Sequence, residues 1–275
     1  MSTAAWLPDL QHAVAAESGK TVRLEVSDAV AEIVLARPEK LNAIDTGMLL
    51  GIRAALAGCT GRPEVRALIV RGDGRCFSAG GDLSEVRGLV GDSTAFDEFL
   101  DFWHASLMLL ERSPLPSIAA VHGFAFAGGF ELMQVCDFAV AGDRTRIGDQ
   151  HANFGLFPAG GSAQRLPRQI GLRAAKWLLM TGEAVSAAQA LSLGLVNRVV
   201  AEDSVLDEAR RMAEVLAHRS RHGTAAIKEA VRLGMGRPLT DAIALERPLT
   251  LRQMASEDAQ LGFAAFDART EPEFP

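Results

Sequence analysis

The segment at residues 120–137, AVHGFAFAGGFELMQVCD, constrains the fold of this sequence more than any other stretch. It predicts a short apolar strand over residues 118–121, a connection rich in glycine and phenylalanine, and a helix beginning near Gly128 and Gly129. Glycines at a helix entrance leave backbone N–H groups uncovered, and the helix dipole adds partial positive charge there. The corner therefore suits a negative oxygen, which belongs either to a phosphate or to the oxyanion of an activated carbonyl.

Glu131 favours the carbonyl over the phosphate. It stands one turn inside the predicted helix, and the sequence has neither a G-x-x-x-x-G-K-[ST] pattern nor any Lys or Arg between Ala119 and Asp143. A carboxylate would repel phosphate, but a carbonyl compound that loses or gains an α-proton needs a base in this place. The alternative is a structural glutamate that is stabilised by the N-terminal end of the helix dipole.

A second glycine-rich corner, Gly80-Gly81-Asp82, follows a strand-like segment at residues 76–78. Two backbone donors aimed at one oxygen cost no reorganisation, and losing one of them typically lowers a rate about 10²–10³-fold. Taken singly, each of these glycines is also explained by a tight turn. Their arrangement ahead of Asp82 and Glu131 favours a shared site.

The order of the predicted elements indicates an α/β fold. Residues 22–26 and 31–35 predict a hairpin around Asp28, and Asp45 predicts the cap of a helix that runs to about Gly58. A buried strand is predicted at residues 67–70 because its apolar residues do not alternate with polar ones. Strand, loop and helix repeat from Phe77 and again from residue 118, so the loops at one end of the sheet are expected to form the site. Further helices are predicted at residues 174–180, 187–193, 205–217, 223–233 and 241–256.

Composition limits the class of protein. The chain has 275 residues, of which 48% are hydrophobic, and a formal net charge of −6 with scattered basic residues, which argues against nucleic-acid binding. No apolar run reaches the length of a membrane span, and no secretory signal pattern is evident at the N-terminus. Three cysteines without metal-ligand spacing predict neither a disulfide framework nor a metal site, and they indicate a reducing cytoplasm. Tyrosine is absent, which excludes mechanisms that use a phenol.

Several long motifs, in order and in register, resemble the enoyl-CoA hydratase/isomerase (crotonase) superfamily. Besides residues 120–137, they are RPEKLNA at 37–43, FSAGGD at 77–82, GLFPAGGSAQRLPR at 155–168 and the TGE to GLVNRVV run at 181–200. The resemblance implies a crotonase-type spiral of repeated ββα units with a helical C-terminal trimerisation segment. It divides the chain into an N-terminal extension (1–20), a spiral core with a CoA-thioester site (21–200) and a helical oligomerisation segment (201–275).

The resemblance also implies the residues of the site. The N–H groups of Gly81 and Gly128 would form an oxyanion hole for the thioester carbonyl, next to Glu131 as a base. The CoA-binding residues would be Lys40, Ala79, Gly80, Asp82, Phe266 and Arg269. Ser84 occupies a position where many members carry a lysine for the CoA phosphates, and Lys40 and Arg87 are its candidate substitutes.

The sequence departs from the family at His151. In the hydratases a second glutamate follows the first by twenty positions, and here that position, counted from Glu131, is a histidine. The next family landmarks are in register from Gly155 onward, so an acid has been replaced by an imidazole. Asp149 is placed to orient this histidine by a hydrogen bond. The alternative is a solvated or structural loop histidine.

These observations predict an enoyl-CoA hydratase-like lyase in which Glu131 and His151 act as acid and base beside the oxyanion hole. No metal or redox cofactor is implied, since CoA is part of the substrate, and the family implies a trimer or a dimer of trimers. Two rivals use the same scaffold, an enoyl-CoA isomerase and a C–C bond hydrolase. A third is a non-catalytic acyl-CoA-binding paralogue.

Overall fold

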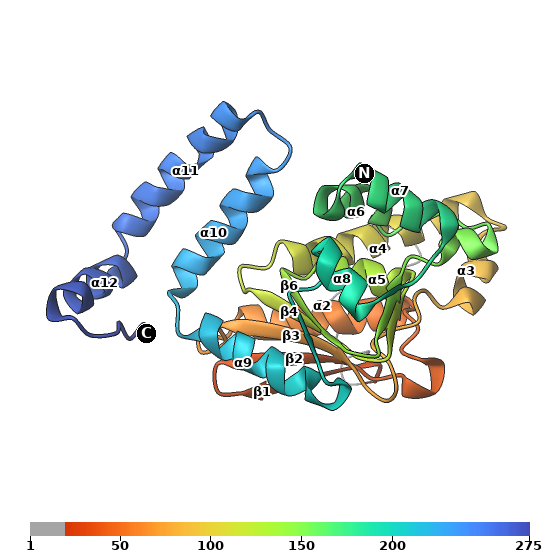
Figure 1. Ribbon diagram of the computed structural model, residues 1–275, viewed down its shortest axis with the longest axis horizontal. Helices are drawn as coiled ribbons and strands as arrows, with labels where there is room; N and C mark the ends of the chain where they lie inside the picture. The colour runs from red at the N-terminus through yellow and green to blue at the C-terminus, as the bar shows by residue number, and fades with distance from the viewer. Residues whose placement is uncertain (1–19) are drawn as a thin grey trace.

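The structure is a computed structural model that describes residues 20–275, so the predicted extension at 1–20 lies outside the described residues except for Lys20. Its main sheet starts as an antiparallel hairpin and continues with parallel strands (Figure 1). The hairpin turn around Asp28 is confirmed, with Asp28 at a φ of +51°. In spatial order the strands are β1 (Val22–Ser27), β2 (Val30–Leu35), β3 (Ala67–Gly72), β4 (Ser117–Val121), β6 (Phe138–Gly142) and β9 (Arg198–Val200).

Both faces of this sheet are buried. Along β3, Leu68 and Val70 belong to the main hydrophobic core, whereas Ala67 and Ile69 belong to a smaller cluster on the other face. Successive side chains of a strand point to opposite faces, so a strand covered on both sides is apolar at every position. This explains why the sequence predicted a buried strand here without alternation. Helix α9 (Val205–Ala217) supplies the cover for the second face (Figure 1).

A second, three-stranded sheet carries the segment that follows β4. Its strands are β5 (Phe124–Phe126), β7 (Arg146–Gly148) and β8 (Val185–Ser186). The strand expected at residues 76–78 is reduced to one bridge between Ser78 and Ala125. It ends there because Gly80, with a φ of +109°, turns the chain away from β5.

Helices fill the space between and around the sheets. The predicted cap is confirmed: the carboxylate of Asp45 accepts a hydrogen bond from Met48 N (2.8 Å) at the start of α2 (Thr46–Thr60). The long helix α4 (Ser93–Glu111) packs against α2, and α5 (Gly128–Gln134) is entirely buried. The remaining core helices are α3 (Leu83–Leu89), α6 (Ser162–Ile170), α7 (Leu172–Thr181) and α8 (Ala187–Leu193), with short 3₁₀ helices at Pro38–Lys40, His151–Phe154 and Glu202–Ser204.

The RPEKLNA loop is held by one buried side chain, Asn42. Its amide donates to the carbonyls of Asp73 (2.8 Å) and Cys76 (3.0 Å), and its oxygen accepts from Arg37 N (3.0 Å). Asn42 has a φ of +53°, a conformation that asparagine tolerates better than most residues. These bonds place the next residues, including Ile44, against the chain at Gly80 and Gly81.

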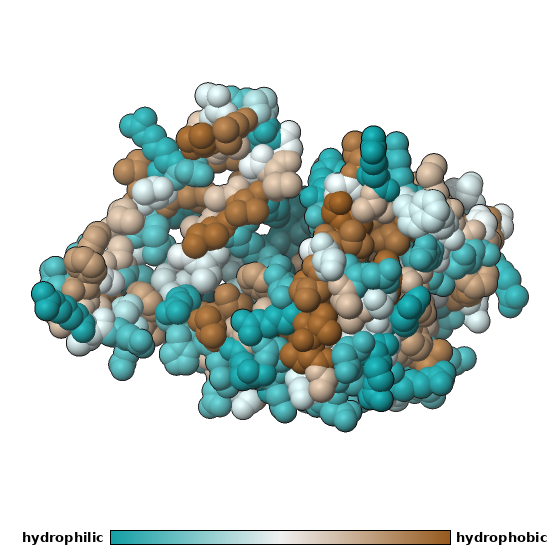
Figure 2. Space-filling view, in the orientation of Figure 1, coloured by the Kyte–Doolittle hydropathy of each residue, from teal (hydrophilic) through white to brown (hydrophobic). Residues whose placement is uncertain are grey.

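The C-terminal helices extend away from the core (Figure 1). They are α10 (Arg221–Gly234), α11 (Leu239–Met254) and α12 (Glu257–Ala268). The expected segment boundary at residue 200 falls before α9, but α9 packs on the sheet, so the extension itself starts at α10. Figure 2 shows hydrophobic residues along the extension and on the core beside it, and a groove of about 770 Å³ lies between α10 and the core. Within residues 20–275, none of the helices has the length and apolar character needed to cross a membrane.

Candidate active site

Hydrogen bonds to β5 bring the two glycine-rich corners together. Ser78 N donates to Phe124 O (3.3 Å), and Phe126 N donates to Ser78 O (3.0 Å). The chain then continues from Ser78 into Gly80-Gly81 and from Phe126 into Gly128-Gly129. The two glycine-rich corners therefore follow directly after paired backbone segments and lie side by side. A Cβ built on Gly80 would lie 3.0 Å from Gly128 N, and one built on Gly128 would lie 3.1 Å from Gly81 N. No side chain fits between them.

The backbone orientation leaves both amides available. Ile44 N donates to Gly80 O (2.7 Å), and Asp82 N donates to Ile44 O (2.8 Å). In this parallel bridge the N–H of Gly81 itself points away from Ile44. Gly128 is the first residue of α5, where an N–H has no acceptor within its helix. Across residues 20–275, neither the Gly81 nor the Gly128 amide donates to another group of the chain. The pair thus presents two neighbouring donors.

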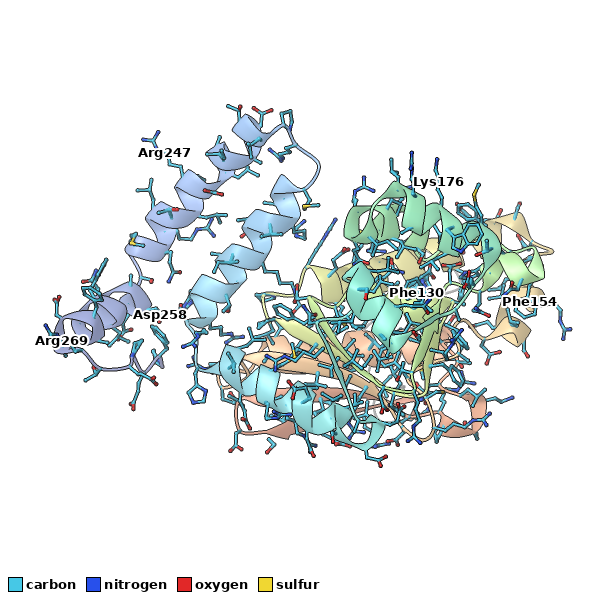
Figure 3. The ribbon with its side chains drawn as sticks, viewed as in Figure 1. Phe130, Phe154, Lys176, Arg247, Asp258 and Arg269 are labelled. Carbon is cyan, nitrogen blue, oxygen red and sulfur yellow. The ribbon has the colours of Figure 1, made fainter. Side chains whose placement is uncertain are left out.

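Glu131 lies one turn into α5, and its side chain is buried. The residue is only 2% exposed, and one carboxylate oxygen, Oε1, accepts from Ser162 N (3.2 Å). Burial raises the pKa of Glu131 to about 7, opposed by the charge of His151 and the N–H of Ser162. Near neutral pH this carboxyl group can therefore both accept and release a proton. Figure 3 labels its neighbour on α5, the fully buried Phe130.

His151 begins the 3₁₀ helix His151–Phe154 and is held by Asp149. Its Nδ1 lies 2.7 Å from Oδ1 of Asp149, which is completely buried. Burial alone would lower the pKa of His151, but the hydrogen bond and charge of Asp149, together with the charge of Glu131, raise it above its ordinary value. The structure therefore brings His151 near Glu131 and orients it through Asp149. A histidine with Nδ1 bonded in this way offers Nε2 for proton transfer.

Three other polar residues hold the backbone. His122 Nε2 contacts Gly74 O (3.0 Å). Asp82 caps α3 by accepting from Ser84 N and pairs with Arg37 at 3.1 Å. Asp137 accepts from Ser117 N (2.8 Å) at the start of β4. None of these contacts points to proton transfer.

The candidate CoA-binding residues fall into two groups. Lys40, Ala79, Gly80 and Asp82 lie in or beside the loop that carries Gly81, and the Lys40 side chain is exposed. Phe266 and Arg269 lie on and just after α12, and Figure 3 shows Arg269 at the opposite end of the molecule from Phe154, which follows His151. Phe266 is 81% exposed. One chain therefore does not bring the second group to the site.

Three residues of the site were not predicted. Gly160 and Ser162 pack against Glu131, and both lie in the 155–168 motif, which was noticed only as a family landmark. Trp103 on α4 packs against Gly128 and Gly160, and its position on an apolar helix face gives no sequence signal for a site. Among the described residues, no cluster of three or more His, Cys, Asp or Glu side chains is placed to hold a metal ion.

Fold and site together define an α/β protein with paired backbone donors beside a buried carboxyl group and a partly buried imidazole. Residues 25–275 match the family described as enoyl-CoA hydratase/isomerase. A probable enoyl-CoA hydratase of Rhizobium meliloti (strain 1021) is 36% identical over 257 residues, covering 94% of this chain and 98% of its own. The crotonyl-CoA hydratase of Syntrophomonas wolfei is 31% identical over 256 residues, covering 93% and 98%.

Solved structures agree with these sequence matches. A crystal structure of enoyl-CoA hydratase subunit I from Geobacillus kaustophilus HTA426 has 36% identity and a TM-score of 0.87, covering 93% of this chain and 98% of its own. A putative enoyl-CoA hydratase from Streptomyces coelicolor A3(2) has 32% identity and a TM-score of 0.88, covering 100% and 98%. The chain belongs to the enoyl-CoA hydratase/isomerase family, within the crotonase superfamily. The resemblance and the α/β crotonase-type fold predicted from the sequence are confirmed, whereas the role of the C-terminal segment in trimerisation stays a prediction.

The pKa of Glu131 predicts a pH-dependent stability difference between the native protein and Glu131→Gln. The folded state holds the Glu131 proton up to about pH 7, whereas the unfolded chain releases it near pH 4.5, so its stabilising effect is lost as the pH rises through 7. Glutamine stays neutral and avoids this loss. Urea unfolding at pH 5, 6.5 and 8 measures the free energy of unfolding of both proteins. As the pH rises, this free energy should increase for the variant relative to the native protein by up to roughly 3 kcal/mol. If the difference in free energy of unfolding between the two proteins does not change with pH, the Glu131 carboxylate is solvated.

Proposed function

We propose that this protein is an enoyl-CoA hydratase-type lyase that adds water across the double bond of a 2-enoyl-CoA, or removes it. The observation that carries the proposal is the buried Glu131 with the partly buried, Asp149-held His151 beside the adjacent amides of Gly81 and Gly128. The names of its relatives, which include a crotonyl-CoA hydratase, support the same substrate class.

The two amides would bind the thioester oxygen. Donors about 3 Å from that oxygen stabilise the negative charge that collects on it when C3 is attacked. The CoA portion would run along the loop of Ala79, Gly80 and Asp82, with the exposed Lys40 ammonium facing its phosphates. Both backbone groups of Gly80 are already bonded within the chain, so Gly80 would contribute shape rather than hydrogen bonds.

Glu131 and His151 would divide the proton transfers. Glu131 takes a proton from water, the water oxygen bonds to C3, and the π electrons of the C2–C3 bond move to the thioester oxygen as an enolate. The enolate then collapses as His151 delivers a proton to C2. The proton left on Glu131 returns to His151 through solvent, so one water molecule has been added and both residues are restored.

The charges of the pair fit this division. Burial raises the pKa of Glu131 to about 7, and Asp149 with Glu131 raises the pKa of His151 above its ordinary value, so both groups can exchange protons near neutral pH. The arrangement with anionic Glu131 and cationic His151 is the one required for hydration. An imidazole needs little tuning for this role, since its ordinary pKa is about 6.5.

The proposal is tested with a panel of 2-enoyl, 3-enoyl and cyclic β-keto acyl-CoAs in H₂¹⁸O, with products read by mass spectrometry. We expect 3-hydroxyacyl-CoA with ¹⁸O at C3 from crotonyl-CoA. Glu131→Gln should abolish this turnover while substrate binding, measured by calorimetry, is retained. Unlabelled 2-enoyl-CoA from a 3-enoyl substrate would instead indicate an isomerase, and ring cleavage with ¹⁸O in a new carboxylate would indicate a C–C hydrolase. Binding without turnover by the native protein would indicate an acyl-CoA-binding paralogue.

His151 is tested by two substitutions with opposite expectations. His151→Ala removes the proton donor to C2 and should lower kcat for hydration about 10²-fold or more. His151→Glu restores a titratable group at the same position and should retain or raise crotonyl-CoA hydration. Unchanged turnover in His151→Ala would leave a mechanism with a single carboxylate and would contradict the proposed division of roles.

We further propose that the chain assembles as a trimer or a dimer of trimers in a reducing cytoplasm. Its three cysteines are free and buried, and the extension exposes large apolar side chains such as Phe266 (81%) and Leu239 (76%). In such an assembly Phe266 and Arg269 would reach the CoA of a neighbouring copy. Light scattering at micromolar concentration should give the mass of three or six chains, and a monomer would contradict the proposal.

A further inference from the structure

The indole N–H of Trp103 is a buried polar group that the proposed proton transfers leave without a role. Trp103 lies on α4 and is 5% exposed. Its Nε1 atom has no hydrogen-bond partner within residues 20–275. A buried donor without an acceptor costs about 1–3 kcal/mol, so native proteins keep few of them.

The position of the indole links this N–H to the site. At one edge of the ring, a Cβ built on Gly128 would lie 2.7 Å from Cζ2 and 2.9 Å from Cη2, so the ring packs directly on the backbone of the candidate oxyanion hole. On the same side of the ring, Nε1 lies beside Gly160, where an added Cβ would collide with both Nε1 and Oε2 of Glu131. The indole therefore contacts the backbone of the paired amides and lies next to the Glu131 carboxylate.

Trp103 Nε1 and Glu131 Oε2 face the same place without bonding to each other. Both lie against the position that a Cβ on Gly160 would take, one as a hydrogen-bond donor and the other as an acceptor. This pair of groups suits one water molecule, which would accept from the indole and donate to the carboxylate. The other oxygen of Glu131, Oε1, already accepts from Ser162 N. This hydrogen bond fixes the carboxylate with Oε2 directed toward Gly160.

We propose that Trp103 positions the water that adds to C3, and this inference rests on the proposed hydratase function. With His151 held by Asp149 and committed to the proton at C2, the water needs another donor besides its bond to Glu131. The Trp103 N–H occupies one lone pair of the water oxygen, and Glu131 removes its proton. The second lone pair is then directed at C3, and such orientation is a large part of the rate of an addition. In the reverse reaction the same N–H donates to the departing C3 hydroxyl.

The experiment compares two reactions in the same full-length protein. Hydration of crotonyl-CoA needs the bound water. Exchange of the C2 protons of butyryl-CoA in D₂O needs the amides and the proton-transferring residue but adds no water. Trp103→Phe should lower kcat for hydration about 10–100-fold, with KM and the exchange rate within about threefold of the native values. The matched control is Trp177→Phe, because Trp177 is 61% exposed on α7 and donates to Glu183 instead; both reactions should be unchanged in it.

A second variant removes the N–H without changing the shape of the ring. Trp103→β-(3-benzothienyl)alanine replaces the N–H by sulfur and should lose hydration as Trp103→Phe does, which excludes misfolding as the cause. Unchanged hydration in this variant, or an equal loss of hydration and exchange, overturns the role of Trp103. A native protein that exchanges C2 protons but does not hydrate crotonyl-CoA overturns the hydratase function itself, and this is seen before any variant is made.

Discussion

The site depends on the few backbone hydrogen bonds that join three separate loops. Ser78 pairs with β5, and Ile44 pairs with Gly80 and Asp82, so residues 80–82 are fixed from two sides. Each bond is modest, but together they determine where the amides of Gly81 and Gly128 point. Because these donors belong to the main chain, no rotamer change can move them. Gly80 and Gly128 are required since a side chain at either position would fill the space between the two corners.

The second constraint is the burial of two carboxylates beside a partly buried histidine. Glu131 and Asp149 are almost fully buried, and His151 lies between the charges of both carboxylates. A buried carboxylate is costly unless a cation or a proton compensates it. The histidine provides that compensation, and its charge opposes the rise in the pKa of Glu131 that burial causes.

The sequence predicted the fold well because the chain repeats strand, loop and helix with clear caps and glycine turns. The Asp45 cap, the hairpin at Asp28 and the helix boundaries at residues 187–193 and 205–217 all depend on local chemistry. Glu131 stood out as one acid in an apolar segment. Trp103 did not, because an aromatic residue on the buried face of a helix has the same pattern whether it fills the core or borders a site. The packing of α9 on the sheet could not be predicted either, since an amphipathic helix pattern does not indicate which element its apolar face packs against.

The extension has a further consequence for how the protein unfolds. Helix α10 packs chiefly on α11, and one link from α10 to the core is Lys228, which bonds Leu115 O and pairs with Asp137. A segment that buries little surface against its own core has a low local stability and opens independently of the rest. In the proposed assembly a neighbouring copy would cover its apolar faces, so its folding would follow mass action. The melting curve of such an assembly would then be a composite of two transitions, of which one shifts with protein concentration and the other does not.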